Sequence, residues 1–299
     1  MPDRHDHDDR HDRGLLYDLA TLRERVAMPA AFERRRALLL MGGAGLGLVL
    51  AACGSNKPDT SATTSSTATT GATSTTSDVT TTTAGSGGEN AVTDAIPEET
   101  AGPYPGDGSN GPNVLTESGI VRSDIRSSFG QYSGTADGVP LSIALAIVSA
   151  GSGEPLPGAA VYVWHCDMEG GYSLYSQGVT QQNYLRGVQA ADDNGRLGFT
   201  SIYPGAYSGR SPHIHFEVFP SLAEATSAGS RLVTSQIALI EDVSSAVYAS
   251  QSGYNQSVGN LARTSLESDN VFRDGYALQL PTMSGDVSSG VALSLTVAV

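Results

Sequence analysis

Residues 141–148 have the sequence LSIALAIV, an apolar run that contains two isoleucines and a valine. Runs of this length that are rich in β-branched residues and bounded by Gly, Pro and Ser are typical of β-strands. The run is followed by the loop 151–157 (GSGEPLP), and the next apolar run, AAVYVWH, covers residues 159–165. We therefore predict two strands joined by a Gly- and Pro-rich loop.

Four further strands are predicted after this pair. Residues 192–195 (DDNG) contain an Asn-Gly step, a strong signal for a β-hairpin, and they precede the apolar run 197–202. Residues 213–219 (HIHFEVF), 233–240 and 291–299 complete the set. Many short strands separated by Gly/Pro turns, with little predicted helix, indicate an all-β sandwich of mostly antiparallel strands.

The charge of the chain excludes several kinds of partner. The chain has 299 residues and a formal net charge of −14. Residues 1–52 hold eight basic and eight acidic side chains, so the whole net charge falls on residues 53–299. Because phosphate binding needs a basic stripe, this composition argues against nucleic acid, and against adhesion to anionic lipid through charge.

Residues 1–52 are predicted to be an export signal with a polar N-terminal extension. Three arginines at positions 34–36 precede an apolar stretch that ends at Leu50 and is too short to span a bilayer comfortably. These arginines and the following Ala-Leu-Leu resemble a twin-arginine signal, and residues 50–54 (LAACG) resemble the bacterial lipobox, in which Cys53 is lipidated. We therefore expect an exported protein of the bacterial cell envelope, lipid-anchored at Cys53 to the outer face of the membrane. The alternative is an ordinary signal peptide that happens to contain a cysteine.

The remainder of the chain divides into a tether and one domain. Residues 53–89 are dominated by Ser, Thr, Ala and Gly without periodicity, which is typical of a disordered tether. Residues 90–299 are long enough to form one sizeable core. Because Cys166 is the single cysteine of this domain, we expect it to be an unpaired packing residue.

A pair of histidines in one predicted strand is the first candidate for a functional site. His213 and His215 are two residues apart, so their side chains lie on the same face of the strand and can converge on one metal ion. The same pattern also occurs by chance and in cupins. A cupin would need a further histidine downstream, and none follows His215. His165 is expected to be structural or to support a ligand.

Tyrosines are the other candidate ligands in this part of the chain. A tyrosinate is a hard anionic donor with a free pKa of about 10, so a strongly Lewis-acidic ion such as Fe(III) is needed to remove its proton at neutral pH. Two histidines and two tyrosinates would therefore suggest ferric iron, although any one of these tyrosines could equally be a packing residue. The candidates are Tyr172, Tyr175, Tyr184, Tyr203 and Tyr207.

Four stretches of the sequence resemble the intradiol ring-cleavage dioxygenases, the family of catechol and protocatechuate dioxygenases. They are ETAGPYP at 99–105, VWHCD with GGYS at 163–173, PGAY with RSPHIH at 204–215, and TSQI at 234–237. Together they cover about residues 98–240. The order and spacing of Trp, Tyr, Tyr, Arg and His-x-His carry most of the specificity. The resemblance implies a β-sandwich with long active-site loops and a non-haem Fe(III) cofactor.

The resemblance also implies the ligand set. Tyr172 matches the tyrosinate that the family retains, and Tyr175 is the competing assignment for that role. Tyr207 matches the tyrosinate that leaves the iron when substrate binds. His213 and His215 match the two imidazole ligands.

Two further residues match the family's substrate pocket. Arg210 matches the arginine that stabilises charge on the substrate ring, and Gln236 matches a polar pocket residue. The implied reaction inserts both atoms of O₂ in intradiol cleavage of a catechol-type substrate, which yields a cis,cis-muconate-type product. The long helical dimerisation segment of the catechol-specific branch is absent, so the resemblance leaves the oligomeric state and the identity of the catechol open.

The sequence also allows a second interpretation, in which the domain is a binding or scaffold module and not an enzyme. Residues 154–159 (EPLPGA), followed by DNGR at 193–196 and YPG at 203–205, resemble transthyretin-like and carboxypeptidase-regulatory sandwich modules, which serve in binding or scaffolding. Such a module does not need Tyr172 or Tyr207 beside the two histidines.

Overall fold

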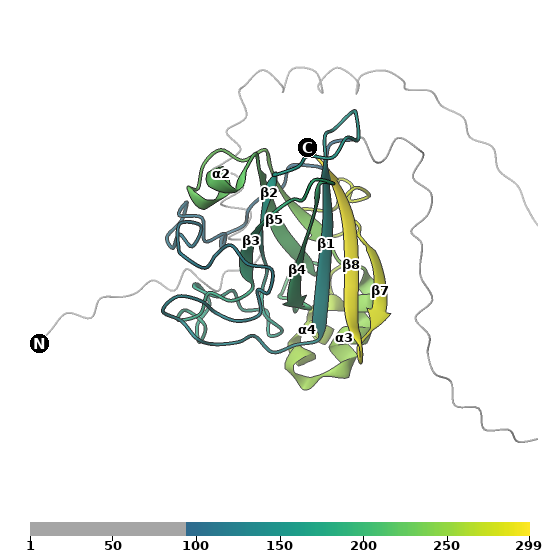
Figure 1. Ribbon diagram of the computed structural model, residues 1–299. Coiled ribbons are helices and arrows are strands. Elements are labelled where there is room, and N and C mark those ends of the chain that lie inside the picture. The colour runs from purple at the N-terminus through teal and green to yellow at the C-terminus, as the bar shows by residue number, and fades with distance from the viewer. Residues whose placement is uncertain (1–93) are drawn as a thin grey trace, which may run out of the picture. The chain divides into compact units, whose positions relative to one another are not determined.

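The computed structural model describes residues 94–299, which form two four-stranded sheets packed face to face (Figure 1). The predicted export signal, Cys53 and the tether lie outside the described residues, as do the first four residues of the predicted domain. All strand pairs are antiparallel except β1 with β8. The first sheet has the order β4-β1-β8-β7, with bounds Arg196–Ile202, Pro140–Val148, Gly290–Ala298 and Thr282–Asp286. The second has the order β3-β2-β5-β6, with bounds Arg186–Ala190, Ala160–Trp164, His213–Phe219 and Val233–Ala238.

The predicted all-β sandwich is confirmed, and so are the six predicted strands. Sequence analysis missed β3 and β7, which are short and carry an arginine and a glycine, respectively. Helices are few and short: α2 (Leu222–Thr226), α3 (Glu241–Ser250), a 3₁₀ turn (Ser252–Tyr254) and α4 (Asn255–Leu261). Within residues 94–299, none of them is long and apolar enough to cross a bilayer.

The hairpin prediction for residues 192–195 was wrong. The segment does form a tight turn, in which Gly195 N–H donates to the Asp192 carbonyl and Gly195 has φ +73°. However, the strands on either side belong to different sheets, because β3 pairs with β2 whereas β4 pairs with β1. The Gly195 carbonyl also accepts from Ile147 N–H of β1, so the turn carries the chain from one layer of the sandwich to the other.

The second sheet is buried on both faces. Its inner face, which includes Val161, Ile214 and Phe216, packs against β1 and β8 in the main core. Its outer face, which includes Tyr162 and Trp164, is covered by a smaller core built from the N-terminal segment and the loop after β2. Strand alternation places His213 and His215 on this outer face, so the fold buries the predicted metal site under long loops.

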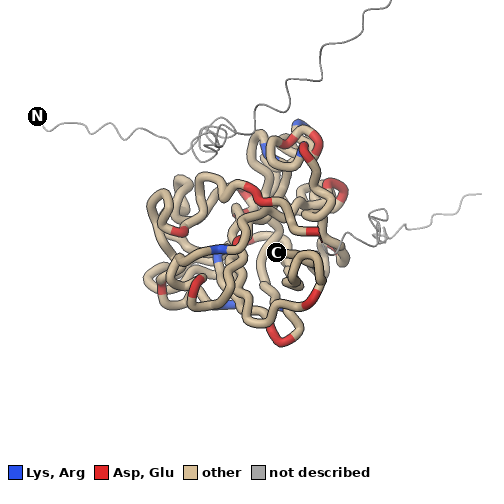
Figure 2. Tube along the Cα trace, turned by 90° about the horizontal axis from the view of Figure 1, so that it is seen from above, with Lys and Arg blue, Asp and Glu red and all other residues tan. Residues whose placement is uncertain are grey.

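The surface of the described domain is acidic. Acidic positions are spread around the outside of the chain trace, whereas basic positions are few (Figure 2). Residues 94–299 contain no lysine, and two of their arginines, Arg186 and Arg210, are buried.

Candidate metal centre

The two histidines of β5 converge as their spacing predicts. His213 and His215 are 3% and 2% exposed, and their Nε2 atoms are 3.1 Å apart with ring planes at 81°. Two donors that bind one metal ion at about 2.1 Å in neighbouring positions lie about 3 Å apart. The Nε2 separation therefore fits two ligands of one ion.

Each imidazole is oriented by its surroundings. His213 Nδ1 lies 2.6 Å from the Ser211 carbonyl, which can only accept, so Nδ1 carries the proton and Nε2 keeps its lone pair. The His215 ring stacks on Trp164 at 4.9 Å with planes 6° apart. Gly102 also approaches this ring closely, because a Cβ atom at its position would lie 3.3 Å from His215 Cε1.

Two tyrosines bring phenol oxygens to this pair. The Tyr207 hydroxyl lies 3.1 Å from His213 Nε2. The Tyr172 ring packs edge-on against both Tyr207 and His215, at centroid distances of 5.9 and 6.1 Å. Tyr172 is 2% exposed, and its hydroxyl is a buried polar atom without a hydrogen-bond partner among the described residues. Buried hydroxyls are normally satisfied, so an unpartnered phenol oxygen beside two imidazoles indicates a missing ligand.

The competing tyrosines are engaged elsewhere. Tyr175 accepts from Gly106 N–H and donates to Asn110 Oδ1, both at 2.9 Å. Tyr184 donates to Asp167 Oδ2 at 3.2 Å, and the Tyr203 hydroxyl is bonded to Ser244 Oγ. The geometry therefore favours Tyr172 over Tyr175 as a ligand.

The surroundings of the candidate ligands His213, His215 and Tyr172 favour their neutral forms. Burial, assisted by the charge of Arg210, lowers the pKa of His213 and of His215 well below the ordinary value. Burial, assisted by Tyr207, raises the pKa of Tyr172 well above its ordinary value. Neutral imidazoles are ready to ligate, whereas the phenols would need a strongly acidic cation to ionise.

The candidate ligand atoms, here called the donor set, are His213 Nε2, His215 Nε2 and the hydroxyls of Tyr172 and Tyr207. Their chemistry restricts which metal ion could bind. Within residues 94–299, no group of three or more His, Cys, Asp or Glu side chains could hold an ion. A metal at His213 and His215 would therefore draw its remaining protein ligands from Tyr172 and Tyr207. Two imidazoles with two phenolates suit a hard, highly charged ion such as Fe(III) better than Zn(II) or Mg(II). The residues present thus fit the predicted iron.

Arg210 and Gln236 also reach the site. Arg210 is 2% exposed, and its Nη1 lies 3.5 Å from His213 Nε2. Its Nη2 donates to Gln236 Oε1 at 2.7 Å, while Gln236 Nε2 donates to the Thr100 carbonyl. All six predicted site residues of the domain are therefore brought together in the structure.

Sequence analysis missed the residues that anchor the two tyrosine loops. Arg186 of β3 donates to both the carbonyl and the Oγ of Ser173, next to Tyr172. Asn260 and Ser257 of α4 bind the carbonyl and the N–H of Ala206, next to Tyr207. These contacts join segments that are far apart in the chain, so a local sequence pattern cannot predict them.

His165 and Cys166 have structural surroundings, as expected for packing residues. His165 Nε2 is bonded to Ser201 Oγ and Nδ1 to the Cys166 carbonyl, each at 2.7 Å. Cys166 is an unpaired thiol that donates to the Gly205 carbonyl, and burial raises its pKa. Neither side chain is bonded to a predicted ligand.

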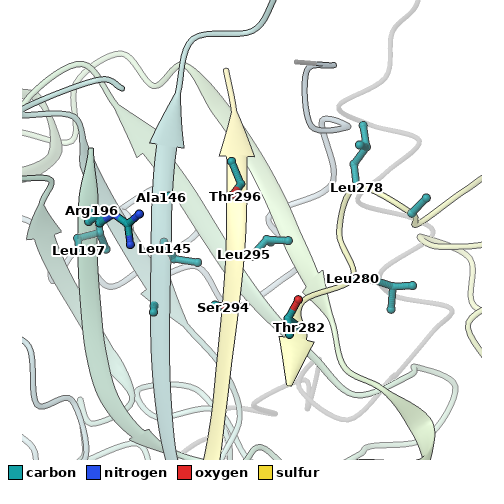
Figure 3. A pocket seen from close by; sticks show the side chains of 12 residues that line it. Leu145, Ala146, Arg196, Leu197, Leu278, Leu280, Thr282, Ser294, Leu295 and Thr296 are labelled. Carbon is teal, nitrogen blue, oxygen red and sulfur yellow. The ribbon is translucent and has the colours of Figure 1, made fainter. Parts of the chain in front are cut away.

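A surface cavity of about 410 Å³ lies on the other sheet (Figure 3). Its lining includes Ala146, Arg196 and Thr296 from β1, β4 and β8, together with Leu278 and Leu280 from the segment before β7. None of the predicted site residues lines it. The convergent donors, not this cavity, define the candidate site.

Glu99 is linked to the site through Gln279, whose Nε2 lies 3.3 Å from Glu99 Oε1 and 3.1 Å from the Gln236 carbonyl. Burial, with a smaller contribution from Asp274, raises the pKa of Glu99 to about 7. The folded protein therefore keeps a proton that the unfolded chain releases as pH rises from about 4.5 to about 7. Glu99 should thus lower the free energy of unfolding progressively across that window.

Glu99→Gln is expected to remove this part of the pH dependence, because glutamine does not ionise. Urea unfolding of the metal-free protein at about pH 5 and about pH 8 measures it, and the variant should lose less stability between the two than the wild type. Glu98→Gln, at the exposed neighbouring position, is the control and should behave as the wild type. An unchanged difference in Glu99→Gln would show that the carboxyl does not titrate in this window.

The chain resembles known dioxygenases in sequence. The model of the family described as "Dioxygenase" matches residues 111–244. A catechol 1,2-dioxygenase of Pseudomonas sp. (strain EST1001) is 41% identical over 56 residues, which cover 19% of this chain and 18% of the relative. A chlorocatechol 1,2-dioxygenase of Rhodococcus opacus is 31% identical over 86 residues, which cover 22% of this chain and 34% of the relative. The matches therefore span about a fifth and about a third of these relatives.

The fold resembles a solved member more completely. The intradiol ring-cleavage dioxygenase from Tetranychus urticae is similar at a TM-score of 0.52 and 26% identity, over 69% of this chain and 94% of that one. With the family match over residues 111–244, the region that holds the convergent histidines and tyrosines, this likeness supports the intradiol ring-cleavage dioxygenase family for the described domain.

Proposed function

We propose that this protein is an Fe(III)-dependent dioxygenase that cleaves catechol-type rings between the two hydroxyl-bearing carbons. The observation that carries the proposal is the convergence of His213 Nε2 and His215 Nε2 beside the Tyr207 hydroxyl and the unpartnered Tyr172 hydroxyl. The two relatives described above are named as enzymes that act on catechols, which supports the substrate class. The product would be a cis,cis-muconate-type dicarboxylate.

In this proposal Tyr172, Tyr207, His213 and His215 hold the iron. Bound ferric iron would supply Lewis acidity and an electron sink for a catechol and O₂. The burial of the site excludes water, which strengthens every electrostatic interaction within it.

The surrounding residues have separate tasks. Tyr207 is less buried than Tyr172, and its Oη can accept a proton from a substrate hydroxyl as the tyrosinate gives way. Arg210 places a cationic N–H group 3.5 Å from His213 Nε2, where it can stabilise negative charge that develops on the ring. Gln236 holds Arg210 Nη2 and so limits where that charge can lie.

The visible spectrum tests the iron ligands. Purified protein with ferric tyrosinate should be red to brown, and adding catechol should shift the colour and start oxygen uptake. Tyr172→Phe should bleach most of the colour because the buried ligand is lost, whereas Tyr175→Phe, the matched control, should keep it. Colour retained in Tyr172→Phe and lost in Tyr175→Phe would move the ligand to Tyr175. Colourless wild-type protein without bound iron would favour the binding or scaffold module.

We also propose the location inferred from residues 1–89: export through the signal at 1–52, lipidation at Cys53, and a tether at 53–89 that holds the catalytic domain at the outer face of the membrane. The motif around Cys53 supports this proposal. In a bacterial host, Cys53→Ser should release the protein from the membrane fraction. Unchanged partitioning would contradict the lipid anchor.

A further inference from the structure

A carboxylate from the segment between α4 and β7 is bonded to Arg210 beside the candidate metal centre. Asp269 is fully buried, and both of its oxygens accept from Arg210 Nε, at 3.2 and 3.0 Å. It also accepts from Ser211 N–H at 2.6 Å and from Val271 N–H at 2.8 Å. The residue lies outside the matched segment 111–244 and carries no signal in the sequence.

These bonds fix the direction of the Arg210 guanidinium. The group is planar, so holding Nε on Asp269 and Nη2 on Gln236 Oε1 leaves little freedom for Nη1. That third nitrogen lies 3.5 Å from His213 Nε2, at the centre of the donor set. Phe272 packs near Arg210 and His213: its ring centroid lies 5.9 Å from Arg210 Cζ and 6.4 Å from the centroid of the His213 ring.

Asp269 also acts on the backbone that orients a ligand. Its bond to Ser211 N–H holds the peptide segment whose Ser211 carbonyl accepts from His213 Nδ1 at 2.6 Å. The Asp269 carboxylate thus supports both the Arg210 guanidinium and the tautomer of the His213 imidazole. Outer contacts of this kind commonly change metal affinity or activity by about 10–100-fold when they are removed.

We propose that Asp269 is a positioning residue that aims Arg210 Nη1 at the substrate-binding side of the metal centre. The proposal rests on the proposed dioxygenase function for its catalytic consequence, whereas the orientation of Arg210 can be measured without metal. A buried carboxylate could instead serve stability alone, and the experiment separates the two roles.

The first measurement uses metal-free protein. The Arg210 Nε–H signal, assigned by its loss in Arg210→Lys, should exchange slowly with solvent in the wild type because Asp269 holds it in a buried ion pair. In Asp269→Asn it should exchange about ten-fold faster or more, because hydrogen bonds to a neutral acceptor are weaker. Asp274→Asn, at an exposed position of the same segment, is the control and should match the wild type. Fast exchange in the wild type overturns the proposal even if Asp269→Asn does not fold.

The second measurement uses iron-loaded protein and catechol. Asp269→Asn should lower kcat by about 10–100-fold with a smaller change in KM, because a misdirected cation affects the transition state most. In an Arg210→Lys background the same substitution should cost less than about two-fold, because coupled residues are not additive. An equal loss in both backgrounds would mean that Asp269 does not act through Arg210 and overturns the proposal. Inactive wild-type protein with slow Arg210 exchange would instead remove the proposed function and leave the orienting contact standing.

Discussion

His213→Ala is expected to lower the affinity for iron by more than about 100-fold and to remove ring cleavage, because losing a direct ligand should cost at least as much as losing a supporting contact. The remaining donors cannot compensate, since no third histidine, cysteine or carboxylate joins the group within residues 94–299. Iron retained after dialysis against a chelator measures the effect.

His165→Asn is the matched control for this prediction. His165 is also a fully buried imidazole, but it is bonded to Ser201 Oγ and the Cys166 carbonyl, away from the donor set. The control should keep its iron even if its stability falls. Equal loss of iron from both variants would mean that the effect reports unfolding and not ligation.

Arg186→Met is expected to lower the free energy of unfolding by about 2–5 kcal/mol, because buried acceptors that lose their only donor cost about 1–3 kcal/mol each. Arg186 is fully buried and no described carboxylate pairs with it; its donors instead bind neutral oxygens. The Pro105 carbonyl and the Ser173 hydroxyl would keep their bonds to the Tyr162 hydroxyl and the Tyr184 carbonyl, but methionine would take one hydrogen-bond donor away from each of the five acceptors. They are the carbonyls of Tyr104, Pro105 and Ser173 and the hydroxyls of Tyr162 and Ser173.

Urea unfolding measures this loss, with Arg196→Met as the control. Arg196 is an exposed arginine of β4, so its replacement should change the free energy of unfolding by no more than about 0.5 kcal/mol. A loss below about 1 kcal/mol in Arg186→Met would show that the hydrogen bonds of the guanidinium contribute little. Because Arg186 holds Ser173, the variant should also loosen the loop of Tyr172.

The strands were predictable because their patterns are local. Residues 141–148 alternate between a buried and a solvent-facing side, and the His213–Phe219 strand places both histidines on one face. The Asn-Gly turn at 194–195 led to a wrong hairpin prediction because a turn shows only that the chain reverses its direction. Which strand then pairs with which is decided by the register of β4 against β1, where Ala146 lies opposite Arg196.

The candidate ligands were predictable and their supports were not. The spacing of His213 and His215 suggests chemistry on its own, whereas Tyr172 and Tyr207 were distinguished from the other tyrosines only by the family resemblance. Asp269, by contrast, is one acidic residue in a polar segment, typical of a solvent-exposed turn until the fold places it against Arg210. Arg186 in β3 resembles a surface arginine in the same way, although it is buried between two loops.

Isotope labelling tests the central claim most directly. Iron-loaded protein should be given catechol under ¹⁸O₂, and the ring-opened product analysed by mass spectrometry. We predict a dicarboxylate cleaved between the two hydroxyl-bearing carbons that carries label from both atoms of O₂, with some loss of label to water during hydrolysis. A product cleaved outside the hydroxyl pair, or unlabelled product, would contradict intradiol dioxygenation at the site formed by Tyr172, Tyr207, His213 and His215.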